Sequence, residues 1–285
     1  MNSTKTINNK ILSIQNTKKI TKAMEMVAAS KMRKNKKNIE YSYYYTKNIF
    51  KIINNFTLNN LNYKHPYLNK RNIKCIGYLI ISTDRGLVGG LNINLFKKIL
   101  INIKKLNKKN IKVKIFLIGS KAFQFFNLFN IKIISKIENI GDKPKLTKII
   151  KLIKIIISLY NEGKLDKIYI ANNIFINTLS QTPQIKQILP LLFLKKINKK
   201  NICYNYIYES NSIKTINIIL NMYIESQIYK NIIENLLSEQ AARMIAMKSA
   251  TENANSLIKE LKLIYNKIRQ TNITQEIAEI FSGII

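Results

Sequence analysis

Both ends of the chain lack the two residues that interrupt helices, and this limits its fold more than any other feature. Residues 1–64 and residues 191–282 contain neither glycine nor proline. Each end is therefore expected to form one long helix. At a rise of about 1.5 Å per residue, the predicted helices Thr4–Phe56 and Ser212–Phe281 would span roughly 80 and 105 Å. Helices of this length need each other, or a large partner, to bury their apolar faces.

The middle of the chain holds seven of the eight glycines and all four prolines. Apolar runs alternate there with helical patterns, which predicts an α/β fold with a mostly parallel sheet and helices on its faces. The predicted strands are Ile73–Ser82, Ile111–Ile118, Ile131–Ile137 and Lys167–Asn173, with less regular candidates at Ile185–Leu194 and Ile202–Tyr208. The predicted helices are Leu91–Leu106, Lys121–Phe129 and Leu146–Asn161.

The two predicted end helices carry different kinds of residue on the faces that could pair: isoleucines on the first and small side chains on the second. Ile7, Ile11 and Ile14 recur at helical spacing near the N-terminus. Near the C-terminus a zone of small residues covers 241–250. Small side chains let two helices approach closely, although alanine also favours any helix. We expect the end helices to pair as an antiparallel coiled coil.

The formal net charge of +33 has two interpretations. A strongly basic chain is typical of proteins that bind nucleic acid or an acidic surface. The lysines are instead spread along a chain rich in Ile, Lys and Asn, which favours compositional drift. The tyrosine cluster 41–45 adds to the first interpretation, but no recognised nucleic-acid motif is present. A basic coiled-coil nucleic-acid-binding protein is kept as the alternative prediction.

A glycine-rich turn, Asp84–Gly90, joins a predicted strand to a predicted helix, where phosphate-binding loops occur. Its glycines fit neither G-x-G-x-x-G nor the P-loop pattern. We therefore interpret Asp84 and Arg85 as a local turn pair and expect no nucleotide here.

Metal and catalytic signatures are equally weak. Cys75 and Cys203 lie far apart without histidine or cysteine at ligand spacing, and His65 is the only histidine. No triad or metal site follows, so we expect no catalytic residues, metal or cofactor. No apolar run approaches the roughly 18–20 residues of a membrane span, and the N-terminus lacks a signal core.

Four segments resemble one known family. Ile14–Arg33 resembles the N-terminal helix of the gamma subunit of bacterial F-type ATP synthases. Ser82–Asn94 resembles the glycine-rich segment of the same family, with Val88 where the family usually has cysteine. Ser238–Met244 and Tyr265–Ile277 are similar to its C-terminal helix. The resemblance covers essentially the whole chain, in order.

The resemblance implies a fold and a function. The fold would be two long terminal helices in an antiparallel coiled coil, 1–60 and 210–285, with a central Rossmann-like α/β domain, 70–208, that lacks the dinucleotide site. The chain would be the central rotor shaft, coupling proton flow through the membrane c-ring to conformational cycling of the catalytic beta subunits during ATP synthesis. It would itself have no catalytic site.

The same resemblance implies partners and a location. The partners would be three alpha and three beta subunits, the epsilon subunit and the c-ring, with no specific nucleic acid. Membrane contact would occur only through the complex, peripherally, at the cytoplasmic face of the bacterial inner membrane.

Contact residues carry over from the family by position. Contacts to alpha and beta are implied for Met24, Lys31, Arg33, Lys34, Arg243, Gln270 and Thr274. An apolar bearing tip is implied for Ile280, Phe281, Ile284 and Ile285, and contact with the c-ring for Tyr206 and Glu209.

Overall fold

The computed structural model describes residues 2–59, 65–69, 71–129, 131–142, 144, 146–191 and 212–283. Its contacts form two compact units, one of residues 1–30 with 243–285 and the other of residues 31–242. The predicted boundaries near residues 60–70 and 208–210 fall largely outside the described residues, and that division stays a prediction.

Two long helices contribute to both units, α1 (Asn2–Asn59) and α5 (Ser212–Ser282). Their ends lie within three residues of those predicted from the missing glycines and prolines. Because no proline removes a backbone donor, the i→i−4 hydrogen bonds continue without a break. Threonine hydroxyls in the helices bond carbonyls one turn back, as Thr17 does to Ser13 at 3.0 Å.

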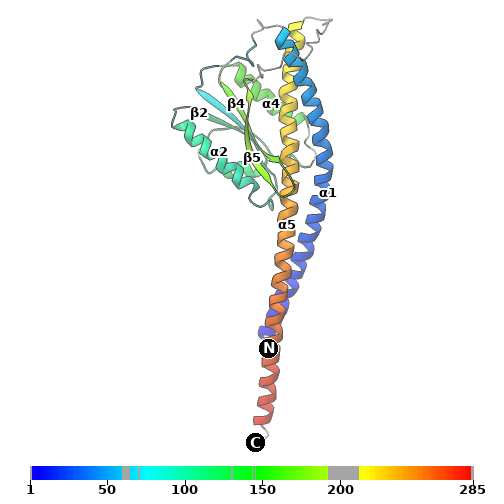
Figure 1. The fold of residues 1–285 in the computed structure, drawn as a ribbon. Helices are drawn as coiled ribbons and strands as arrows, with labels where there is room; N and C mark the ends of the chain where they lie inside the picture. The colour runs from blue at the N-terminus through cyan, green and yellow to red at the C-terminus, as the bar shows by residue number, and fades with distance from the viewer. Residues whose placement is uncertain are drawn as a thin grey trace. The chain divides into compact units, whose positions relative to one another are not determined.

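In the first unit, α1 and α5 run antiparallel (Figure 1). The buried positions of α5 in this unit follow steps of four and three residues: Arg243, Met247, Thr251, Ala254 and Ile258. On α1, Ile11, Thr21 and Ala28 are buried. Their intervals of ten and seven residues are sums of steps of three and four. This 3–4 spacing is that of a coiled coil. Residues 273–282 of α5 are all exposed.

The second unit contains a five-stranded sheet in the order β3-β2-β1-β4-β5. Its strands are β1 (Cys75–Ile81), β2 (Lys112–Ile118), β3 (Ile133–Ile137), β4 (Lys167–Phe175) and β5 (Gln181–Leu189). β1 pairs in parallel with β2 and β4, and β2 in parallel with β3, whereas β5 is antiparallel to β4. The prediction of a mostly parallel sheet is confirmed.

The edge strand β5 begins four residues earlier and ends five residues earlier than the predicted strand Ile185–Leu194. The strand was predicted to start after Pro183, because proline disrupts a strand pattern and is tolerated only in an edge strand. A tight turn leads into β5: the Asn177 side-chain oxygen accepts the N–H groups of Leu179 and Ser180, at 3.0 and 2.6 Å. The predicted strand Ile202–Tyr208 and Cys203 lie outside the described residues.

Three helices cover the sheet: α2 (Leu91–Asn107), α3 (Ser120–Phe126) and α4 (Leu146–Asn161). Alternate residues of β1 face opposite ways. Ile80 packs with Leu95 of α2, whereas Leu79 packs with Ile153 of α4 and with buried residues of α1 and α5. In this unit the long helices are therefore part of the core that supports the sheet. α3 ends three residues before the predicted Phe129, as residues 127–129 form a turn.

Candidate functional site

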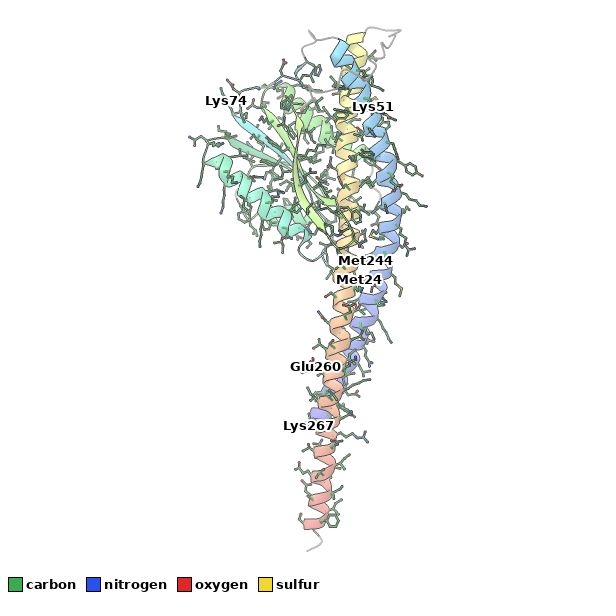
Figure 2. All side chains as sticks on the ribbon, in the orientation of Figure 1. Met24, Lys51, Lys74, Met244, Glu260 and Lys267 are labelled. Atoms are coloured by element: carbon green, nitrogen blue, oxygen red, sulfur yellow. The ribbon has the colours of Figure 1, made fainter. Side chains whose placement is uncertain are left out.

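The predicted contact residues in the first unit differ in exposure. Met24 is half-buried on α1 and Arg243 is buried on α5. Gln270 and Thr274 are exposed one turn apart, and the Thr274 hydroxyl donates to the Gln270 carbonyl at 2.9 Å. Figure 2 labels Met24 on α1 and Met244 on α5, the two helices of this unit. These positions present mixed polar and apolar groups.

The predicted tip is an exposed apolar helix end. Ile280 and Phe281 are 62% and 70% exposed, and Ile273 and Ile277 nearby are also exposed. These four apolar side chains lie in the exposed stretch at the end of α5. Ile284 and Ile285 lie outside the described residues, as do Tyr206 and Glu209.

The predicted basic stretch falls in the second unit, and one of its members has a partner within the chain. The Lys31 ammonium lies 2.7 Å from the Asp142 carboxylate, in the loop after β3. Arg33 and Lys34 are exposed on the same helix. Lys31 is therefore partly neutralised by the chain itself, while Arg33 and Lys34 present their charge to solvent.

Asp84 makes long-range contacts, so its interpretation as half of a local turn pair is wrong. Its carboxylate accepts N–H groups from Ser120 at 3.1 Å, Asn139 at 3.2 Å and Ile140 at 2.8 Å, with a longer contact of 3.5 Å from Gly141. Ser120 is the first residue of α3. The Asp84 carboxylate therefore ties the glycine-rich turn to the start of α3 and to the loop after β3.

The glycine-rich segment also packs on α5. Val88 and Leu91 form a small buried cluster with Ala242. Within the segment, the Asn92 amide donates to the Thr83 hydroxyl, which donates to the Arg85 carbonyl, both at 2.7 Å. The glycine-rich segment, which follows β1, is thus packed directly against α5.

A second polar contact joins β4 to α5, and no sequence pattern indicated it. The Asn235 side-chain oxygen accepts both the backbone N–H and the side-chain amide of Asn173, each at 3.1 Å. The Ser238 hydroxyl donates to the Asn173 carbonyl at 3.1 Å. All three residues are buried. Directional bonds in a buried site fix the position of a helix more closely than apolar contacts do.

Lys230 and Glu234 lie one turn apart on α5 and affect each other's ionisation. Burial raises the pKa of Glu234, and the positive charges of Lys230 and Lys186 oppose this. Burial lowers the pKa of Lys230, which the Glu234 carboxylate opposes. The Lys230 ammonium also lies 4.7 Å from the centre of the Tyr43 ring. Tyr41 and Tyr45, which suggested nucleic-acid binding, line a mainly apolar cavity of about 590 Å³ against α4.

Two kinds of feature are absent from the part of the chain that the structure describes. It contains no group of three or more His, Cys, Asp or Glu side chains placed to hold a metal ion. None of its helices combines the length and apolar character needed to cross a membrane.

Comparison with known proteins decides the family. Residues 3–285 match the profile described as ATP synthase. The chain is 54% identical, over 283 residues, to the ATP synthase gamma chain of Baumannia cicadellinicola subsp. Homalodisca coagulata, covering 99% of each protein. The chain belongs to the ATP synthase gamma chain family. As a gamma chain, it is a subunit of the ATP synthase complex.

Solved structures share the fold at low sequence identity. A chain of the Euglena gracilis mitochondrial ATP synthase, in a structure of OSCP, F1 and c-ring, aligns with a TM-score of 0.66 at 20% identity, covering 99% of this gamma chain and 94% of the other. A chain of the Tetrahymena thermophila central stalk and c-ring aligns with a TM-score of 0.60 at 23% identity, covering 81% and 99%. The predicted fold class is confirmed, and the nucleic-acid alternative finds no support among these relatives.

Proposed function

We propose that this gamma chain is the central rotor shaft that couples proton flow through a membrane c-ring to the catalytic cycle of ATP synthesis. The main supporting observation is the pair α1 and α5, two uninterrupted helices that run antiparallel through a seam with small and polar members. A shaft has to resist bending and twisting, and uninterrupted helices do so. Its outer face has to pass several partners in turn, which favours exposed polar groups over a continuous apolar patch.

The contacts with the alpha and beta subunits are proposed from position and exposure. Met24, Arg243, Gln270 and Thr274 lie on α1 and α5 in the first unit. Arg33 and Lys34 are proposed to meet an acidic segment of beta, because their charges are exposed. Lys31 belongs to the same basic stretch, and its ion pair with Asp142 would reduce its share of that contact.

The two ends of the shaft are proposed to have different partners. Ile280, Phe281 and Ile284 would form an apolar bearing inside the ring of alpha and beta subunits, since non-directional contacts allow rotation. The α/β domain, with Tyr206 and Glu209, would attach to epsilon and the c-ring. The three-part division 1–60, 70–208 and 210–285 is proposed with these roles.

Catalysis and membrane contact are proposed to belong to other subunits. The sites that make ATP would lie on beta and alpha, and this chain would carry none. It would reach the membrane only through the complex, at the cytoplasmic face of a bacterial inner membrane.

Assembly tests this function directly. The chain is co-expressed with its matching alpha and beta chains, and the product is analysed by sizing, native mass and ATP hydrolysis. One copy per three alpha–beta pairs, with hydrolysis that depends on it, is the expected result. Independent migration of the chain, or its recovery on nucleic acid alone, would contradict the proposal.

A further inference from the structure

We propose that Asp84 is a positioning residue for torque transfer, because it organises a collar that fastens the α/β domain to both long helices. The collar is defined here as residues 84–91 and 139–142 with their contacts to Lys31 of α1 and Ala242 of α5. This inference rests on the proposed rotor function. The collar adds a role for the glycine-rich segment that the rotor proposal does not require.

The centre of the collar is the Asp84 carboxylate. It accepts N–H groups from three consecutive residues, Asn139, Ile140 and Gly141, and a fourth from Ser120. Successive backbone N–H groups of this kind form a concave nest that favours an anion. Asn139 and Gly141 both have positive φ, at 56° and 66°. An aspartate carboxylate therefore holds the loop after β3 in a conformation that it would otherwise adopt reluctantly.

The first connection leads from this loop to α1. Asp142 directly follows the nest and lies 2.7 Å from the Lys31 ammonium. Both side chains are partly exposed, so the attraction between them is weak in energy. Its contribution is geometric, because it places the loop over one position of α1. Asp84 sets the geometry by fixing the three residues before Asp142.

The second connection leads from the glycine-rich segment to α5. Val88 and Leu91 bury side chains against Ala242, which is small enough for close approach. Positive φ values at Leu87 and Gly89, 62° and 57°, fold the segment back toward the helix. The same segment therefore contacts α5 directly and α1 through the Asp84 nest.

The collar lies at the end of the second unit along both helices. Lys31 and Ala242 are the first and last residues of that unit. Torque applied to the α/β domain has to enter α1 and α5 through contacts within this unit. The collar contacts the residue of each helix at which the unit ends. Apolar contacts are non-directional and resist sliding weakly. The bonds of Asp84 and Asp142 are directional, so they favour one angular setting of the domain on the helices.

The experiment uses the complete complex with alpha, beta, epsilon and the c-ring in sealed vesicles. ATP hydrolysis and proton transport are measured on the same preparation for the native chain, Asp84→Ala, Lys31→Asp, Asp142→Lys and the reversed pair Lys31→Asp/Asp142→Lys. We expect Asp84→Ala and Asp142→Lys to assemble and hydrolyse ATP with a loss of protons moved per ATP. Lys31→Asp should show the same loss of protons per ATP, and its hydrolysis rate is not compared because Lys31 also belongs to the proposed contact with beta. The reversed pair should recover that ratio, which a general loss of stability would not do.

The matched control breaks a different exposed ion pair. Lys164→Asp disrupts the 2.7 Å contact with Glu162 in the turn after α4, and should leave the ratio unchanged. Amide exchange at residues 139–141 should accelerate in Asp84→Ala and stay native in the control. If Asp84→Ala does not assemble, Asp84→Asn takes its place: it keeps the size of the side chain but removes the charge that the nest binds, and should show the same loss of protons moved per ATP.

The outcomes separate the two proposals. A native chain that fails to assemble would contradict the rotor function itself. A coupled native complex whose single variants retain the full ratio, or whose reversed pair gives no recovery, would overturn the collar alone.

Discussion

The hydroxyl oxygens of Thr21 and Thr251 lie 2.8 Å apart in the buried seam between α1 and α5. Each oxygen also has a carbonyl of its own helix within reach, Lys18 at 3.0 Å and Met247 at 2.8 Å. Both polar groups are therefore satisfied although they are buried. A polar pair in an otherwise small and apolar seam specifies which residues of the two helices face each other.

Valine in place of these threonines tests that contact. Thr21→Val and Thr251→Val should each lower the free energy of unfolding by about 0.5–1.5 kcal/mol, and the double variant by less than the sum. Valine keeps the shape, so the hydrogen bond is the main loss. Denaturant unfolding measures all three, with the exposed Thr17→Val as control. Strict additivity would show that the two hydroxyls do not interact.

Gly119 is expected to be irreplaceable. Its φ is +100°, and an added Cβ would lie 2.5 Å from the Ser82 carbonyl oxygen. Gly119→Ala should therefore cost more than the roughly 1–2 kcal/mol of an unfavourable backbone conformation alone. Gly163→Ala is the matched control, because Gly163 has φ +71° but open space around it. Equal losses of unfolding free energy would contradict the predicted clash.

The buried Asp166 ties the start of β1 to β4. One carboxylate oxygen accepts the N–H groups of Lys74 and Cys75, at 2.7 and 2.8 Å. Asp166→Ala leaves these donors without that acceptor and should cost about 1–3 kcal/mol of unfolding free energy. Glu162→Ala, at an exposed carboxylate, should change it by less than about 0.5 kcal/mol. Similar midpoints for both variants in urea would refute this role.

Tyr78 should make the fold sensitive to strong alkali. Burial, and secondarily the neighbouring Tyr169, raise the pKa of Tyr78 to about 12 from its ordinary value of 10. Between these pH values the unfolded chain releases the proton and the folded chain retains it. The contribution to stability is thus complete below pH 10 and is lost as pH rises through about 12.

Phenolate absorbance checks this prediction. The difference between the native chain and Tyr78→Phe should be one phenol that ionises near pH 12 or only on unfolding. An ionisation near the ordinary tyrosine value in the folded chain would show that Tyr78 is not protected.

The sequence predicted the features that depend on local rules. Missing glycine and proline at the ends predicted α1 and α5 almost to the residue, because helix continuity is decided locally. The alternation of apolar runs predicted four of the five strands closely. The predicted start of β5 was wrong because Pro183 lies inside this edge strand, where the missing N–H donor of proline is tolerated.

The contacts that organise the candidate site were harder to predict from the sequence. Asp84 reaches partners 36 to 57 residues away, so its neighbours in sequence gave only the misleading pairing with Arg85. Asn173 and Asn235 meet across 62 residues, and neither lies in a distinctive pattern. Long-range polar contacts depend on how the sheet and helices pack, and a single sequence carries no periodic signal for them.

Direct observation of rotation tests the central claim most sharply. The complex with alpha and beta is fixed to a surface, and a probe is attached to an exposed residue of the α/β domain such as Lys74, labelled in Figure 2. A rotor shaft should turn the probe in one direction when ATP is hydrolysed, with three equivalent pauses per turn, one for each beta subunit. A probe that stays still, or fluctuates without direction, while the complex hydrolyses ATP would contradict it.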